Sequence, residues 1–548
     1  MCRGMRLLTR RSSVVPVRLV LMALVAMGSM TWGCASDDKP PPAPSFTLRV
    51  PSEPTLRFSL QDRTPLVIEV TREVPFVGAI ALTLQGLPAH IKVETSPVFV
   101  TETEKTGTFH LRVEELAPYG RFPIRVVGES GAGRFTLDVM VEVQPGPAAV
   151  DVSFGTEGLV LPALGLPSVS IRDMAVQPDG KWILVGSTGA AGSRDVLVAR
   201  LLPDGTPDAS FGTQGTRVID VCGGDDALEA ATLLPDGRLV LAGSAVADTN
   251  GCTALKRQSL LLVRLTATGA LDPTFGNAGV WTFQHTMGTS WLSSVAVDSQ
   301  GRFVGAGTVK GTDSDQLMVR LLPTGQLDPS FGTDGQVLEN YGRGDTARVV
   351  LVLADDALLL GGTTYEHAEG MTLRRYRANG ERDVTFNFVP PASATASRGP
   401  RKLYPVAGGK VLVVAGTASG EHGTSYGVTL SQFDATGAVD ASFGVQGSQG
   451  ASTPPGYGRD MLAGSGVLPG GEIAVATLDP SKVGGSEIGL VHISANGTKL
   501  RSHRPDLSGA QQPMAAVVDA EGFFRVAGLH TAPGATEAVP FVTRFWPY

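Results

Sequence analysis

A short phrase whose clean form is Asp-x-Ser-Phe-Gly returns six times along this chain at nearly constant intervals. Its phenylalanines are residues 154, 211, 275, 331, 386 and 443, so successive copies lie 55 to 64 residues apart. A fixed period of this size predicts a tandem array, because each unit is too small to bury its own apolar face and must stack on its neighbours.

Each unit also contains three apolar runs, and the first two are joined by a Gly-containing turn. Four antiparallel strands in about 57 residues, counting a short strand after the Phe-Gly turn, are typical of one β-propeller blade. Asp-Gly hairpin turns disfavour the parallel coils of a solenoid. The second runs lie at 179–186, 236–243, 301–307, 356–362, 409–416, 471–476 and 522–528, and the third runs at 196–201, 260–265, 317–321, 371–376, 428–433, 488–493 and 541–545. We therefore predict an all-β chain with a seven-bladed β-propeller over residues 148–548.

The two ends of the array predict how the ring closes. The array begins with a Phe-Gly turn and one short run, residues 159–161, and it finishes on a third run, residues 541–545. This offset is what a ring needs when its first strand completes its last blade. We expect these two segments to pair, because closure removes the free sheet edges that promote aggregation.

The repeated phrase resembles that of the bacterial delta-60 repeat family, from residue 148 to about residue 450. The resemblance implies a repeat of exported bacterial proteins that has no established common activity. The copy at Asp383 has Asn387 in place of its glycine, and the sixth junction keeps only Asp506-Leu507-Ser508-Gly509. The resemblance rests on Asp208-Ala209-Ser210-Phe211-Gly212, Asp272-Pro273-Thr274-Phe275-Gly276, Asp328-Pro329-Ser330-Phe331-Gly332 and Asp440-Ala441-Ser442-Phe443-Gly444.

The residues that recur in the phrase have structural explanations. Asp caps a turn through its side chain, Phe fills the core between blades, and Gly adopts a backbone conformation that other residues resist. A polar residue of the third run precedes the Asp by eight positions in five repeats, as Arg200 precedes Asp208. Repetition in every blade favours a structural bond over a catalytic one. We assign this structural role to Asp208, Phe211, Gly212, Asp272, Phe275, Gly276, Asp328, Phe331, Gly332, Asp440, Phe443 and Gly444.

The N-terminal segment is typical of an export signal. Five arginines are followed by an apolar run over residues 19–27 that is too short for a stable membrane span. Thr31-Trp32-Gly33-Cys34 resembles the lipobox of bacterial lipoproteins, which implies lipidation of Cys34; an ordinary secretory signal is the alternative. We predict a signal peptide over residues 1–33 and a polar, Pro-rich tether over residues 34–44.

The charge of the chain limits its partners. Removal of residues 1–33 moves the formal net charge from −7 to −12, because this segment carries five arginines and no acid. An acidic protein is poorly suited to polyanions, so we do not expect nucleic acid binding. No later stretch approaches the ~20 apolar residues of a membrane span, so membrane attachment is expected through the lipid alone. We predict a monomeric lipoprotein of the outer membrane or cell surface.

Residues 45–147 lack the repeat but alternate apolar and polar residues in seven short runs. This pattern fits a small antiparallel β-sandwich. The stretch 82–93 resembles bacterial immunoglobulin-like surface modules, and a spacer that lifts the array from the membrane is its simplest role. The runs are 46–50, 66–70, 79–84, 91–94, 109–113, 122–127 and 135–143.

Two cysteines remain for the folded part of an exported chain, and we predict that Cys222 and Cys252 form a disulfide. Both fall in loops at the same end of the ring, within the longest repeat. Paired metal thiolates are the alternative, but no further ligand lies at a suitable spacing. The eight histidines form no metal-binding motif, so the sequence predicts neither a metal nor a cofactor.

Two short motifs can be explained without a catalytic or adhesive role. Residues 423–427 match the hydrolase pattern G-x-S-x-G, but they lie between two predicted strands, whereas the pattern requires a strand-to-helix elbow. Arg343-Gly344-Asp345 spells an adhesion tripeptide, although the same Asp could cap the turn before a first strand.

Two hypotheses for function remain. The first is a binding scaffold whose loops at one ring face, including Cys252, residues 343–345 and residues 366–370, meet a protein or glycan ligand. The second is a propeller enzyme of the lyase, lactonase or glycosidase type with its site in the central channel. Convergence of three or more charged groups in the channel would favour the enzyme. The candidate groups are Arg172, Asp173, Asp226, Arg348, Arg401, Lys402, Arg459 and Asp460.

Overall fold

The computed structural model describes most of the chain beyond the predicted tether. Its ranges are 45–57, 63–73, 76–114, 116–131, 133–146, 148–246, 257–342, 344–364, 370–390, 397–419, 425–451, 462–479 and 486–547. Every regular element in these ranges is a β-strand. No helix there is long and apolar enough to cross a bilayer. The predicted signal peptide, the tether and Cys34 lie outside the described residues.

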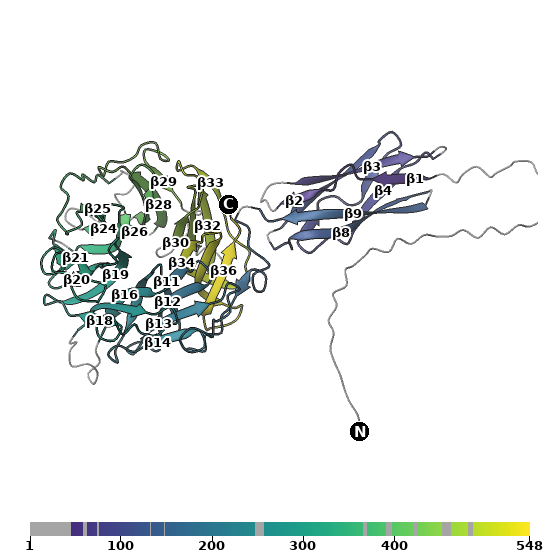
Figure 1. Cartoon of the computed structure of the whole chain (residues 1–548). Coiled ribbons are helices and arrows are strands. Elements are labelled where there is room, and N and C mark those ends of the chain that lie inside the picture. Colours follow the sequence, from purple (N-terminus) through teal and green to yellow (C-terminus); the bar gives the residue numbers. More distant parts are fainter. Residues whose placement is uncertain are drawn as a thin grey trace, which may run out of the picture.

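Two sheets form a β-sandwich at the N-terminal end of the described chain (Figure 1). Both are antiparallel except where β2 pairs with β9 in parallel. The first sheet has the order β1 (Phe46–Arg49), β3 (Thr64–Arg72), β7 (Thr106–Val113) and β5 (Ile91–Val93). The second has the order β2 (Thr55–Arg57), β9 (Gly133–Gln144), β8 (Gly120–Ser130), β4 (Ile80–Gln85) and β6 (Val98–Val100).

Alternation of apolar and polar residues gives the sandwich its core. Along β7, Phe109, Leu111 and Val113 are buried while the residues between them are half-buried or exposed. They pack with residues of the other sheet in one cluster, as expected when alternate side chains of each strand point inward. All seven runs expected from the sequence contain strands, and β2 and β6 are additional three-residue strands.

The remainder of the chain forms, within the described residues, seven sheets arranged in a ring (Figure 1). We number them I to VII and give their strands in hydrogen-bonded order. Sheet I is β11 (Ser170–Val176), β12 (Trp182–Thr188), β13 (Asp195–Leu201) and β14 (Thr216–Ile219); sheet II is β15 (Ala227–Leu233), β16 (Leu239–Ala245), β17 (Ser259–Leu265) and β18 (Val280–Phe283); sheet III is β19 (Thr289–Val297), β20 (Phe303–Lys310), β21 (Ser314–Leu321) and β22 (Gln336–Glu339).

The other four sheets continue the same order. Sheet IV is β23 (Thr346–Val352), β24 (Leu358–Thr364) and β25 (Gly370–Tyr376); sheet V is β26 (Ser397–Val406), β27 (Lys410–Ser419), β28 (Ser425–Phe433) and β29 (Ser448–Gly450); sheet VI is β30 (Leu462–Val467), β31 (Ile473–Asp479), β32 (Glu487–Ile493) and β33 (Lys499–His503); sheet VII is β34 (Ala510–Val518), β35 (Phe524–Thr531), β36 (Val539–Phe545) and β10 (Leu159–Val160). The predicted second and third apolar runs all fall on strands.

The first strand of each sheet contacts the first strands of the next and the previous sheet, from β11 through β34 and back to β11. These strands therefore surround the axis of the ring, and β14 and β18 lie at its rim (Figure 1). This is the arrangement of a β-propeller. Buried side chains between successive sheets form the separate core clusters of the ring, as in the cluster that joins sheets I and II.

The pairing expected to close the ring is confirmed. Leu159 pairs with Thr543 and Val160 with Val542, so a strand that precedes sheet I completes sheet VII. A second bond joins the same two ends, since Arg544 Nε donates to Asp151 Oδ2 at 2.6 Å. Both contacts link residues more than 380 positions apart in the sequence.

In sheets I to V, the repeated phrase links each sheet to the next. In the first full copy, the buried Arg200 donates to Asp208 Oδ2 at 2.8 Å and to the carbonyl oxygen of Ala267 in sheet II at 2.5 Å. Gly212 has a φ of 54°, and a Cβ atom there would lie 2.1 Å from the carbonyl oxygen of Thr216. Its N–H donates to sheet II as well, at the carbonyl oxygen of Thr268. We call this set of contacts the interblade latch.

The latch weakens where the phrase departs from its clean form. The shortest Arg375–Asp383 contact is 3.8 Å, and in sheet V the residue in the arginine position is Gln432. Sheet IV, which contains Arg375, has no fourth strand among the described residues.

Candidate functional site: charged residues at the axis of the ring

Each first strand carries an irregularity in its pairing with the second strand near its N-terminal half. A β-bulge of this kind re-aims the extra side chain. Because the first strands surround the axis, the bulged residues form a ring of their own. They are Arg172, Glu229, Ser293, Arg348, Arg401, Ala463 and Met514.

Side chains of sheets that are not neighbours meet in this region. Lys402 of sheet V lies with its Nζ 3.3 Å from Oδ1 of Asp173 of sheet I. The other oxygen of Asp173 accepts a hydrogen bond from the Ala231 N–H of sheet II at 3.1 Å. Asp173 therefore has a structural role as well as a place at the axis.

Glu229 extends this group. Its strongest electrostatic neighbours are the guanidinium groups of Arg172 and Arg401, followed by the carboxylate of Asp173. Arg172, Glu229 and Arg401 are exposed, whereas Asp173 and Lys402 are half-buried. Five charged groups from sheets I, II and V therefore interact at one level of the ring, and three of them are cations. We call this set the axial cluster.

The environment of the axial cluster changes its titration. Although the Glu229 side chain is exposed, the protein around it partly desolvates its carboxylate and raises its pKa above the ordinary value, and Arg172 and Arg401 partly oppose this shift. The carboxylate of Asp173 raises the pKa of Lys402, so this side chain is firmly cationic. Burial also raises the pKa of Tyr404, whose hydroxyl donates to the carbonyl oxygen of Ser465 at 2.6 Å.

The candidates for a channel site separate into three groups. Arg172, Asp173, Arg401 and Lys402 come together, and Arg348 is one of the bulged residues. The expectation for Asp226 was wrong: it is fully buried between sheets I and II, because its carboxylate accepts N–H groups of the loops around it. Arg459 and Asp460 lie outside the described residues.

Glu229 was missed by the sequence analysis. It lies three residues after Asp226, at the position of strand β15 that corresponds to Arg172 of strand β11. A comparison of first strands position by position would have found it. The sequence analysis instead chose charged residues near the starts of the first strands, and this choice did not include Glu229.

The surface motifs fall largely outside the described residues. Cys252, Arg343 and residues 366–369 are among those not described. Asp345 is fully buried and accepts the Tyr341 N–H at 2.6 Å, so it caps its loop and is not available for adhesion. Cys222 is buried between sheets I and II, and its disulfide with Cys252 stays a prediction. Ser425 begins strand β28 and does not lie at a strand-to-helix elbow.

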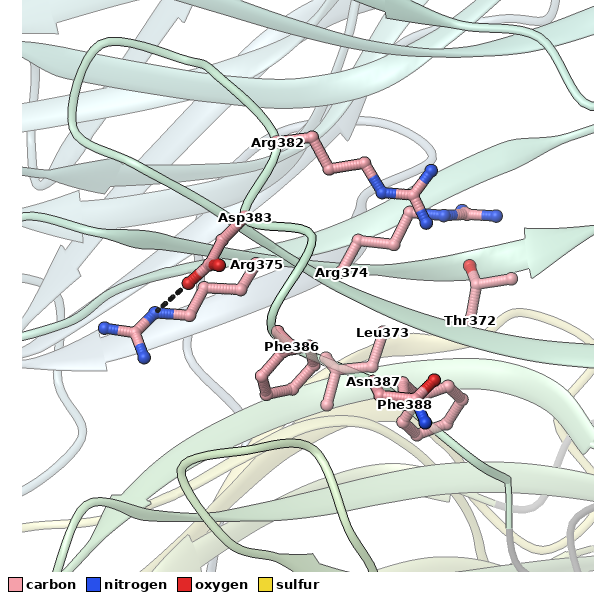
Figure 2. A pocket seen from close by; sticks show the side chains of 9 residues that line it. All are labelled: Thr372, Leu373, Arg374, Arg375, Arg382, Asp383, Phe386, Asn387 and Phe388. Atoms are coloured by element: carbon pink, nitrogen blue, oxygen red, sulfur yellow. Dashed lines mark ion pairs between the residues drawn. The ribbon is translucent and has the colours of Figure 1, made fainter.

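A pocket of about 210 Å³ lies beside strand β25 of sheet IV (Figure 2). Arg374 stacks on Tyr341 with 3.7 Å between its guanidinium carbon and the ring centroid, and Arg375 pairs with Asp355 at 2.7 Å. These two arginines are therefore engaged by the protein itself. The lining residues are Thr372, Leu373, Arg374, Arg375, Arg382, Asp383, Phe386, Asn387 and Phe388.

Comparison with known proteins supports the fold and adds little on activity. A family model described as a domain of unknown function, DUF5122, beta-propeller, matches residues 177–211, 234–275 and 301–331. The chain is thus a β-propeller protein. No curated protein matches the sequence.

Two solved structures illustrate the structural similarity. An apocarotenoid oxygenase variant from Synechocystis is 10% identical, with a TM-score of 0.29 over 86% of this chain and 94% of that chain. An exo-1,5-alpha-L-arabinanase from a bovine ruminal metagenomic library is 10% identical, with a TM-score of 0.26 over 61% of this chain and 97% of that chain. Similarity at this level carries no argument about activity.

Proposed function

We propose that this protein is a lipid-anchored propeller of the cell envelope that binds an acidic ligand, such as a carboxylate-bearing glycan, at the axial cluster. The observation that carries the proposal is the meeting of Arg172, Arg401 and Lys402 at the axis of a chain whose formal net charge is −7. Exposed guanidinium groups suit carboxylates, because their planar N–H donors match both carboxylate oxygens.

The different contacts of the residues in the axial cluster support an anionic ligand. Asp173 is occupied by Lys402 and by the Ala231 N–H, so it neutralises one cation and holds it in place. Arg172 and Arg401 are exposed. Glu229 is the one acid that would repel an anion, and its raised pKa brings it closer to the neutral form under mildly acidic conditions.

The proposed architecture places this site away from the membrane. We propose that sheets I to VII are the seven blades of one closed propeller, with an immunoglobulin-like module at residues 45–147 as a spacer. Cys34 would carry the lipid, and residues 34–44 would tether the module. The Tyr119 hydroxyl donates to the Val150 carbonyl at 2.8 Å and its ring packs edge-on against Trp546, which supports a module fixed beside the closure of the ring.

The binding site can be tested with acidic and neutral oligosaccharides. Isothermal titration calorimetry of the purified protein with an oligogalacturonate and with a neutral dextran fragment should show binding of the acidic probe alone. The double variant R172Q/R401Q should weaken this binding at least tenfold. The matched control is R382Q, which removes one arginine from the outer pocket and should bind as the parent does. Equal losses in both variants would place binding outside the axial cluster.

A propeller enzyme is the second candidate, and the convergence of charged groups favours it. Glu229 has a raised pKa, as a general acid for glycoside cleavage or lactone opening would, and it interacts electrostatically with Arg172 and Arg401. If this is correct, E229Q should still bind a substrate but should release no product, whereas the parent should turn it over. Turnover by E229Q at the parental rate would remove Glu229 from any catalytic role.

The anchor has its own test. The Cys34→Ser variant should lose labelling by a palmitate analogue and should leave the membrane fraction. Labelling that persists in this variant would refute lipidation at Cys34. This result would leave the axial cluster unaffected, because the two proposals rest on different residues.

A further inference from the structure

Successive sheets of the ring meet at a repeated backbone contact beside the start of each first strand. At the junction of sheets I and II, the Asp226 N–H donates to the Arg194 carbonyl oxygen at 2.7 Å. The same bond joins Ser290 to Gln258 between sheets II and III, and Asp345 to Ser314 between sheets III and IV. The three junctions therefore have equivalent backbones.

Two side-chain positions flank this backbone contact at each junction. One is the residue that follows the acceptor carbonyl, and the other is the donor residue itself. They are Asp195 with Asp226 between sheets I and II, Ser259 with Ser290 between sheets II and III, and Asp315 with Asp345 between sheets III and IV. The serine junction shows that the backbone contact does not require carboxylates. The two Asp pairs bring like charges together and need another explanation.

At the first Asp junction, three carboxylates meet. One oxygen from each of Asp195, Asp220 and Asp226 lies within 4.8 Å of the others. Asp226 is fully buried, Asp195 is half-buried and Asp220 is exposed, so the group is reached from solvent on one side. The adjacent cation, Arg194, is engaged by Asp225 at 2.9 Å.

At the second Asp junction, the carboxylates lack hydrogen bonds that their burial requires. Asp315 is 1% exposed, and neither of its oxygens has a partner among the described residues. Asp345 is 0% exposed, and its Oδ1 also has none there. Its Oδ2 accepts the Tyr341 N–H, just as Asp226 Oδ2 accepts the Val221 N–H. A buried carboxylate without a donor costs several kcal/mol unless something compensates it, which points to a missing ligand on these oxygens.

We propose that both Asp junctions bind a divalent cation, and that the cation is Ca²⁺. Hard divalent cations prefer carboxylate oxygens, and Ca²⁺ accepts six to eight oxygen ligands in irregular geometry at about 2.4 Å. Two oxygens on opposite sides of such an ion lie about 4.8 Å apart, so the spread of the three oxygens at the first junction fits one ion. Asn340 stands at the position of Asp220 in the second junction, and its Oδ1 accepts the Gly342 N–H just as Asp220 Oδ1 accepts the Gly223 N–H.

These sites would join neighbouring sheets and would not take part in ligand binding. Asp195 begins strand β13 and Asp226 precedes strand β15, so a shared ion would connect sheet I to sheet II. Asp315 and Asp345 would connect sheet III to sheet IV in the same way.

The stoichiometry of binding tests the proposal directly. The purified full chain is treated with a chelator, dialysed and titrated with CaCl₂ by isothermal titration calorimetry. We expect two ions per chain and a rise in melting temperature with Ca²⁺. The variants D315S/D345S and D195S/D226S copy the natural serine junction, and each should lower the stoichiometry to one. Their combination should bind none.

A gain of binding provides the matched control. S259D/S290D places an Asp pair on the equivalent backbone between sheets II and III and should raise the stoichiometry to three, whereas S259A/S290A should leave it at two. Absence of binding by the chelated parent at millimolar Ca²⁺ would overturn the proposal. So would Asp-to-Ser variants that melt higher than the parent with no response to Ca²⁺, because paired carboxylates sharing a proton would behave in that way.

Discussion

Loss of one carboxylate from the interblade latch should destabilise the protein far more than loss of both partners. The position of choice is Asp272, whose Oδ2 receives Arg264 Nε at 2.8 Å with both side chains more than 90% buried. The same guanidinium donates to the Pro323 carbonyl oxygen of sheet III at 2.5 Å and to Thr274 at 2.6 Å. Its carbon lies 5.0 Å from the centroid of Phe275. The D272A variant would leave this cation buried without its counter-ion.

The magnitude follows from the burial of the pair. Removing one partner of a buried ion pair costs about 3–5 kcal/mol, because the remaining charge stays desolvated. Asp272 also accepts the N–H and hydroxyl of Thr274, and these two bonds contribute about 1 kcal/mol each. R264M/D272A removes the charge together with the acid, so we expect it to lose only about 1–3 kcal/mol. The double variant should therefore be more stable than D272A alone.

Sheet V supplies a matched control. Asp440 makes the same two turn bonds with Ser442, but Gln432 stands in the arginine position and the cation near Asp440 is Lys410, which is 37% exposed. D440A should lose about 1–2 kcal/mol, since no buried charge is left behind.

Urea denaturation followed by tryptophan fluorescence measures these free energies of unfolding. The comparison requires that the slope of the free energy against urea concentration, the m-value, is the same in all variants. The reasoning fails if D272A loses no more than D440A. It fails equally if R264M/D272A is no more stable than D272A.

Three further predictions concern the acids, the closure and the cysteines. Burial alone would raise the pKa of Asp208, but bonds from Ser210 and the charges of Arg200 and Lys181 outweigh it and lower the pKa to about 2. Its contribution to stability should be complete above about pH 4 and lost toward pH 2, and D208N should flatten that part of a urea-midpoint profile. V160P should break the pairing with Val542 and lower the melting temperature, while V160T should keep it. C252S should lower stability by about 3–4 kcal/mol if Cys222 and Cys252 are bonded, and reductant should bring the parent to the same value.

Much of the ring could be predicted from the sequence because its main determinants are local and repeated. An apolar run, a Gly turn and a second run specify a hairpin within about twenty residues, and the period then places each hairpin beside the next. The closure was predictable for the same reason, since a lone run before sheet I needs the partner that sheet VII lacks. Strands β2 and β6 were missed because three residues carry too little alternation to register as a pattern.

The repeated phrase departs from its clean form in sheet IV. Phe386 is followed by Asn387, whereas the clean copies have glycine, and the Arg375–Asp383 contact has lengthened to 3.8 Å. The N–H of Asn387 still donates to the Thr436 carbonyl oxygen of sheet V, so this link between sheets does not require the glycine. The sequence showed the lost glycine but not that this hydrogen bond would persist without it.

The axial cluster could not be assembled from sequence because its contacts cross the ring. Asp173 and Lys402 are 229 positions apart, and nothing in either strand indicates that sheets I and V face each other at that level. The bulge in each first strand is the local feature that matters, since it re-aims one residue per sheet. Residues there differ from sheet to sheet: Arg172 and Glu229 are charged, Ser293 is polar, and Met514 packs against the core cluster of sheets I and VII. The positions that vary among equivalent sheets are therefore where this ring has room for a specific activity, whereas the repeated latch residues are committed to holding the sheets together.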